Sequence, residues 1–190
     1  MANYGPSNFD IRHMIKGHAS YDLPFGVNRK FLSSSKVLDY AIGGWSLFGD
    51  FVTQSGSPFT PRMQTNNSYS LSNGLWYPNV VGDVTAVTGG QSIDSWFNVN
   101  ALAAPTPGTY GNMGRNALIG PRLTAINMSI HKTFTFTERY NLEFSANSTN
   151  IVNHPSFALP DLLIGPGHVG RISGTSVGAR QMELVLKFKF

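Results

Sequence analysis

The sequence predicts an all-β fold of antiparallel, up-and-down strands. Apolar and polar side chains alternate with a period of two along five long segments, which is the pattern of a strand with two different faces. Glycine (20) and proline (11) are frequent, so turns and irregular loops are numerous and long helices are not expected. Charged residues make up only 13% of the 190 residues, about half the usual fraction of a soluble domain.

The C-terminal segment shows the alternation most clearly. Its even positions are all apolar, and four of its odd positions are polar: Met182, Leu184, Leu186, Phe188 and Phe190 alternate with Gln181, Glu183, Val185, Lys187 and Lys189. A strand places these two sets on opposite faces, whereas a helix would scatter them.

Two further segments predict a hairpin. Ile126, Met128 and Ile130 alternate with polar residues before the short turn 137–139, and the same alternation resumes from Tyr140. Lys132 is the one residue that violates the pattern, because a charge occupies an apolar position. With two less regular upstream segments, we expect five long strands at about 12–24, 40–56, 122–137, 139–151 and 179–190.

The connections between these strands alternate between short and long. Residues 25–39 and 137–139 form the shorter connections, whereas 57–121 and 152–178 form long ones rich in Gly, Pro, Asn and Ser. Barrels of the outer membrane have short periplasmic turns and longer extracellular loops. A tilted strand of about 11 residues also spans roughly the 25 Å apolar band of such a barrel. The sequence therefore predicts strands of a transmembrane β-barrel.

Several short motifs resemble the C-terminal barrel region of TonB-dependent receptors, specifically the large Oar-like type. They are 21–26 (YDLPFG), 44–47 (GWSL), 54–59 (QSGSPF), 114–116 (GRN), 120–121 (GP) and the run from Phe144 through 153–157 (NHPSF), with the terminal Phe190. The resemblance covers about residues 10–190. It implies a 22-stranded outer-membrane barrel with an N-terminal plug, energised through a TonB box, that imports large or scarce substrates.

The 190 residues contain no signal peptide, TonB box or plug, and too few strands for that barrel. We therefore expect residues 1–190 to be the C-terminal part of an incomplete barrel, with extracellular loops at about 57–121 and 152–178. The expected location of the parent protein is the cell outer membrane. The expected partners are outer-membrane lipid, the barrel assembly machinery, and the missing plug and strands, with TonB acting only through the missing part.

Three groups of residues are candidates for functional roles. The alternating C-terminal strand resembles the signal read by the barrel assembly machinery, which would recognise it by strand pairing; its residues are Leu184, Leu186, Phe188 and Phe190. Polar residues of the predicted hairpin are expected to face a wet lumen: Asn127, Ser129, His131, Glu143, Ser145 and Asn147. The first long loop either contacts ligand, folds back as a cap or stays disordered, and its candidates for ligand contact are the aromatic residues Trp76, Tyr77 and Trp96.

Other functions have weaker support. The chain has no cysteine, its histidines lack ligand spacing, and its carboxylates form no pair with a nucleophile, so we expect no metal, no cofactor and no catalytic residue. The 14 basic residues are dispersed, which argues against nucleic acid despite a net charge of +4. The alternative that remains is a soluble all-β module, a sandwich whose loops bind carbohydrate or peptide.

Overall fold

The computed structural model describes residues 4–26, 29–31, 36–67, 69, 76–165 and 167–190. The chain divides into two compact units. The loop unit consists of Met1–Met14, Gln54–Leu123 and Ser156–Ser176, and the sheet unit consists of Ile15–Thr53, Thr124–Pro155 and Val177–Phe190.

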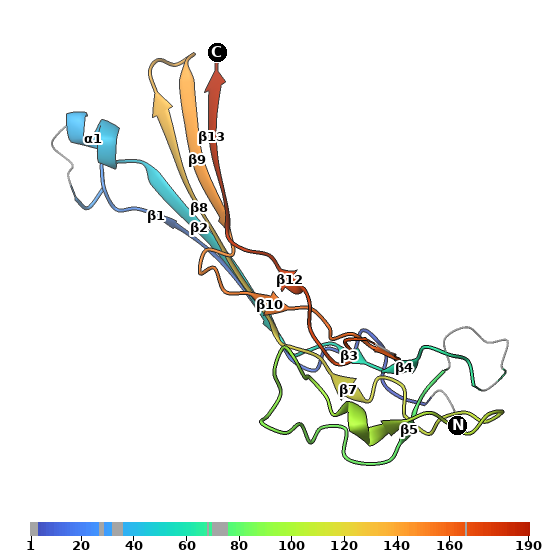
Figure 1. The fold of residues 1–190 in the computed structure, drawn as a ribbon. Coiled ribbons are helices and arrows are strands. Elements are labelled where there is room, and N and C mark those ends of the chain that lie inside the picture. Colours follow the sequence, from blue (N-terminus) through green and yellow to red (C-terminus); the bar gives the residue numbers. More distant parts are fainter. Residues whose placement is uncertain (1–3, 27–28, 32–35, 68, 70–75, 166) are drawn as a thin grey trace. The chain divides into compact units, whose positions relative to one another are not determined.

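The sheet unit is built around one five-stranded sheet, in which neighbours in space are also neighbours among the long strands of the chain (Figure 1). Its strands, in spatial order, are β1 (Met14–Asp22), β2 (Trp45–Gln54), β8 (Leu123–Thr135), β9 (Asn141–Thr149) and β13 (Gln181–Lys189). The predicted all-β fold with five long up-and-down strands is confirmed, and each strand lies within its predicted range.

The register gives the sheet two chemically different faces. Ile130 of β8 lies opposite Ala146 of β9, which lies opposite Leu184 of β13, and both pairings are antiparallel. The adjacent row, His131, Ser145 and Val185, points to the other side. We call the side of Ile130 the apolar face and the side of His131 the polar face.

The first two strands extend the same two faces. The amide of Leu23 donates to the carbonyl of Trp45 (2.8 Å), and the amide of Ser55 donates to the carbonyl of His13 (2.9 Å). These bonds join opposite ends of the two segments, which makes β1 and β2 antiparallel.

The prediction that a strand begins at residue 40 is wrong at its first residues, because a helix lies there. Helix α1 (Lys36–Ile42) occupies part of the connection between β1 and β2. It ends at Ile42, and Gly44, two residues later, has a φ of 68°, the left-handed conformation that commonly follows the end of a helix. No helix in the described part of the chain is long and apolar enough to cross a membrane.

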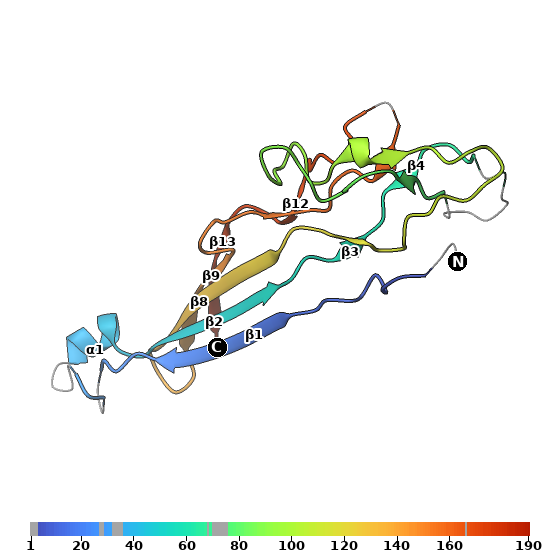
Figure 2. The same ribbon diagram turned by 90° about the horizontal axis from the view of Figure 1, so that it is seen from below.

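The loop unit consists of short elements and irregular chain (Figure 2), and it has a hydrophobic core of its own. The core residues are Phe59, Tyr77, Phe97, Leu102, Met113 and Leu118. The short elements of the chain are β3 (Pro58–Phe59), β4 (Arg62–Met63), β5 (Asn79–Val80), η1 (Val99–Ala101), β6 (Leu102–Ala103), β7 (Leu118–Ile119), β10 (Ser156–Phe157), β11 (Leu163–Ile164) and β12 (Thr175–Val177). The predicted long loops therefore contain an ordered, packed unit.

Candidate functional site

The six residues predicted to face a lumen lie together on the polar face of β8 and β9. Ser129 pairs with Asn147, and His131 pairs with Ser145. Asn127 shares their side, since its amide nitrogen donates to the carboxylate of Asp50 on β2 (2.9 Å). The sixth residue, Glu143, forms an ion pair with Lys189 of β13. Hydrogen-bonding groups therefore continue across β2, β8, β9 and β13.

The polar face is hollowed. A depression of about 580 Å³ extends over β1, β2, β8 and β9, and the residues around it include His18, Ser20, Asp50, Asn127, Ser129 and Asn147. Phe48 stands on the same face and meets the His131 ring edge-on, with the ring centres 5.0 Å apart. A sheet that is concave on its polar side has the curvature expected of a barrel wall around a wet interior.

The opposite face exposes large apolar side chains. The four residues predicted to form the assembly signal are all on this side and largely exposed: Leu184 (70%), Leu186 (67%), Phe188 (54%) and Phe190 (85%). Contact of so much aliphatic and aromatic surface with water is unfavourable, whereas contact with hydrocarbon is not. Their position suits contact with lipid, and it leaves the assembly role as a prediction.

Lys132 is the single charged residue of β8 on the apolar face, and α1 covers it. The residue is only 4% exposed. Its Nζ donates to the carbonyl oxygens of Tyr40 (2.7 Å) and Gly43 (2.6 Å), and it lies 4.8 Å from the centre of the Phe134 ring. Since the last carbonyls of a helix lack partners within the helix, the ammonium group serves as a cap for α1.

Trp45 completes this cap from the neighbouring strand. Its indole nitrogen donates to the carbonyl of Ala41 (3.2 Å), and its ring packs edge-on against Phe144. Lys132 Nζ lies 5.4 Å from the Trp45 ring centre, so the cation is held between aromatic rings. We call this arrangement of α1, Trp45 and Lys132 the helix lock.

Asn150 organises the connection that follows β9. It is 2% exposed and adopts a left-handed φ of 48°, which asparagine tolerates better than most residues. Its side-chain nitrogen donates to the carbonyls of His154 (3.1 Å) and Gly178 (2.8 Å), and its side-chain oxygen accepts from the His154 amide (3.1 Å). Asn153 accepts from the amide of Arg180 (3.0 Å). The two asparagines thereby join the end of β9 to the start of β13.

We expect Asn150→Ala to lower the free energy of unfolding by about 2–4 kcal/mol, because it removes the three hydrogen bonds of a buried side chain and leaves alanine in a left-handed conformation. Asn147→Ala is the matched control, since Asn147 donates one exposed bond to Glu183 (3.3 Å). Its effect should stay within about 0.5 kcal/mol. Urea unfolding in detergent micelles measures both, and equal effects would contradict this account of the turn.

The three aromatic residues of the first long loop lie in different surroundings. Tyr77 is 3% exposed and belongs to the core of the loop unit, so its ring is not presented to solvent. The indole nitrogen of Trp76 is buried without a hydrogen-bond partner. Trp96 packs against the core and donates to the carbonyl of Ile119 (3.0 Å), and it lines a hollow of about 260 Å³. Of these residues, Trp96 is the one best placed to meet a ligand.

A second buried asparagine fastens the N-terminal segment to the loop unit. Asn116 is 5% exposed and left-handed, with a φ of 53°. Its side chain accepts from the Thr60 hydroxyl (3.2 Å) and donates to the Pro6 carbonyl (2.8 Å) and to Asn8 (2.6 Å). The motif 114–116 therefore has a local structural role.

One turn of the loop unit is sensitive to acid. The Thr85 hydroxyl and amide donate to the Asp83 carboxylate (2.6 and 2.8 Å), and these bonds hold the pKa of Asp83 below its ordinary 3.8. The stabilisation is present above that ordinary pKa and is lost as pH falls through the lowered one. We expect the Thr85 amide signal in NMR to titrate with a midpoint below 3.8. Asp83→Asn should abolish the titration, and a midpoint at or above the ordinary value would contradict the assignment.

Two residues of this site were not identified from the sequence. Lys132 carried a signal, because it was the single exception in an otherwise regular alternation. Asn150 carried none, since its role depends on a left-handed backbone that alternation does not report. Among the described residues, no three His, Cys, Asp or Glu side chains are grouped so that they could hold a metal ion.

Comparison with known proteins identifies the domain. The family model described as an outer membrane beta barrel domain matches residues 1–183. A search of curated proteins and a search of solved structures each found no match. The match favours the outer-membrane barrel over the soluble binding module, and it points to a structural or transport role rather than catalysis. With its two-faced antiparallel sheet, the chain belongs to the outer membrane beta barrel domain family.

Proposed function

We propose that this chain supplies wall strands and extracellular loops to a TonB-dependent receptor of the Oar-like type, and that the receptor uses them in substrate uptake. The observation that carries the proposal is the sheet itself, with a concave polar face and an exposed apolar face in an outer-membrane barrel domain. Such a sheet separates lipid from a wet interior, which is the task of a barrel wall.

The motifs shared with Oar-like receptors support the proposal because they include the residues that organise this fold. Trp45 belongs to the helix lock, Asn116 fastens the loop unit, and Asn153 fixes the turn into β13. Gly56 lies so close to the Gly120 carbonyl that a side chain there would meet backbone. A resemblance carried by residues that organise the fold supports an architecture like that of these receptors.

The polar face has the chemistry to meet a plug. Its side chains offer carboxylate, amide, hydroxyl and imidazole groups, and several already bond to one another, either across strands or within β8. We propose the missing N-terminal part of the receptor as the partner of this face, with TonB reaching the barrel through that part.

Strand β13 is an edge of the sheet, and it is the proposed site of recognition during assembly. One side of it pairs with β9 along nine residues, and the other side offers main-chain donors and acceptors. The assembly machinery would add a strand there, and Leu184, Leu186, Phe188 and Phe190 would give specificity through alternate side chains.

In-cell cross-linking tests the receptor proposal. An antibody against the chain should detect, in the outer membrane of cells that express it naturally, a band much larger than the 20.7 kDa of these residues. Formaldehyde should cross-link this protein to TonB and so raise the apparent mass of the band in normal cells. In cells without TonB, the band should keep its apparent mass. A band that never shifts with TonB present would overturn the receptor role while leaving the barrel domain intact.

A further inference from the structure

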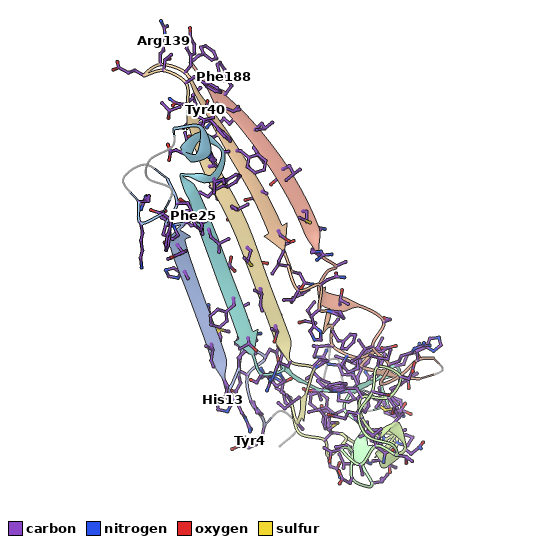
Figure 3. The ribbon with its side chains drawn as sticks, turned by 90° about the vertical axis from the view of Figure 1, so that its left-hand side faces the viewer. Tyr4, His13, Phe25, Tyr40, Arg139 and Phe188 are labelled. Atoms are coloured by element: carbon purple, nitrogen blue, oxygen red, sulfur yellow. The ribbon has the colours of Figure 1, made fainter. Side chains whose placement is uncertain are left out.

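We propose that helix α1 is an interfacial helix, docked on the outer wall of the barrel, that contacts the phospholipid headgroup layer. The inference rests on membership of the outer-membrane family and is independent of the receptor proposal. It concerns the end of the sheet that carries α1, the β8–β9 turn at Arg139, and Phe188, which we call the hairpin end (Figure 3).

Helix α1 lies on the apolar face of the sheet. The Tyr40 ring centre is 5.6 Å from that of Phe134 and 6.0 Å from that of Phe136. Phe134 belongs to the same row as Leu142 and Phe188, which are apolar-face residues. Lys132 reaches the end of α1 from this same face. The helix is therefore outside the concave polar side.

The outer side of α1 has the composition of an interfacial segment. Tyr40 packs against the sheet and is 45% exposed, and Ile42 is 42% exposed, so both residues offer apolar surface to whatever covers this face. Just before the helix, Phe25 and Phe31 have ring centres 5.9 Å apart, and Lys30 Nζ lies 5.5 Å from the Phe31 ring centre. A tyrosine with its polar hydroxyl, and aromatic rings beside a lysine, favour the boundary between hydrocarbon and headgroups.

Aromatic rings also lie at the hairpin end of the neighbouring strands. Tyr140 stacks on Phe188 (5.9 Å between ring centres), and Phe188 lies 6.3 Å from Phe190. Farther along the same face, away from the hairpin end, β13 exposes aliphatic Leu184 and Leu186. An aliphatic band that ends in aromatic rings marks where hydrocarbon gives way to headgroups.

The apolar face continues up to α1, which indicates that the same lipid contacts both. The exposed aliphatic residues of an outer-membrane domain face lipid, and α1 lies on that same face without an intervening polar row. The helix lock fixes its depth, because Lys132 and Trp45 bind the last helical carbonyls from two adjacent strands. It also withdraws the Lys132 charge from hydrocarbon, where an exposed ammonium is strongly unfavourable.

Spin-label depth measurements on the full chain in dioleoylphosphatidylcholine vesicles test this inference. The chain has no cysteine, so Ile42→Cys, Glu138→Cys and Leu184→Cys each create a single attachment site. Collisions with oxygen report hydrocarbon, and collisions with a nickel chelate report water. We expect the label at 42 to have a depth between that of the hydrated label at 138 and that of the label at 184 in hydrocarbon. This depth corresponds to the headgroup layer.

Each other outcome overturns the inference. A label at 42 as hydrated as the one at 138 would place α1 in water, and a label shielded from both reagents would place it under protein. A hydrated label at 184 would show that the face under α1 is not covered by lipid. In the Ile42→Cys background, Lys132→Met should raise the undocked fraction of α1 about thirtyfold or more, whereas Lys16→Met should leave the label unchanged. Because the three labels are read with Lys132 intact, the test does not depend on that variant folding.

Discussion

Replacing Ile130 with lysine is expected to lower the free energy of unfolding in a bilayer by about 2–4 kcal/mol, the cost of a lysine on the lipid-facing side near the bilayer midplane. Ile130 lies at the centre of the apolar face, opposite Ala146, which is opposite Leu184. No acidic residue in these rows could pair with the new ammonium group. The measurement is urea unfolding of the chain in lipid vesicles, followed by tryptophan fluorescence.

Ser129→Lys is the matched control, one residue away on the same strand. Its side chain faces the hollow of the polar face, beside Asn127 and Asn147. A lysine there stays in contact with water, so the expected change is within about 0.5 kcal/mol. Equal destabilisation by the two lysines would contradict the assignment of lipid to one face and water to the other.

The second large effect is expected at the helix lock. Lys132→Met should lower the free energy of unfolding by about 2–4 kcal/mol, because it leaves the carbonyls of Tyr40 and Gly43 without their buried donor. Methionine keeps the volume and apolar character of the lysine stem, so the loss is one of hydrogen bonding and charge.

Hydrogen exchange locates that effect. The amide of Gly43, which donates to the Asp39 carbonyl (2.8 Å), should lose its protection in Lys132→Met and keep it in the control Lys16→Met. Lys16 lies on the polar side of β1, where it is exposed. Unchanged protection of Gly43 in Lys132→Met would mean that α1 is held by other contacts.

The sequence was sufficient to predict the long strands because one face of each strand is mainly apolar and the other mainly polar. Alternation over nine or more residues, as in β13, fixes both the strand and the side that each residue faces. The hairpin of β8 and β9 was predicted from the short turn at 137–139, where the amides of Phe136 and Thr137 both donate to the Tyr140 carbonyl, whereas its register came from the structure. Strand boundaries were less exact, since hydrogen bonding and not composition decides where pairing stops.

Helix α1 could not be predicted because its stability comes from outside its own segment. Seven residues are too few to give a helical period, and a short helix is marginal without tertiary contacts. Its cap comes from Lys132, about ninety residues later in the chain. Lys132 breaks the alternation because it contacts α1. The sequence showed the exception, and only the structure showed the contact that explains it.

The loop unit escaped prediction for a related reason. Its core residues, such as Phe59, Phe97 and Leu118, come from aperiodic segments far apart in the chain. Their packing depends on turns that asparagine and glycine make possible, including the left-handed Asn116. Composition alone indicated a loop and gave no sign of the hydrogen bonds that fasten it.

Cysteine scanning of β13 tests the central claim most directly, since the chain has no cysteine to remove. Single cysteines at positions 181–186 would be treated with a membrane-impermeant maleimide while the chain is in the membrane. We predict that Gln181, Glu183 and Val185 positions react and that Met182, Leu184 and Leu186 positions do not. Equal reactivity at adjacent positions, or the inverse pattern, would contradict a wall with lipid on its apolar face and water on its polar face.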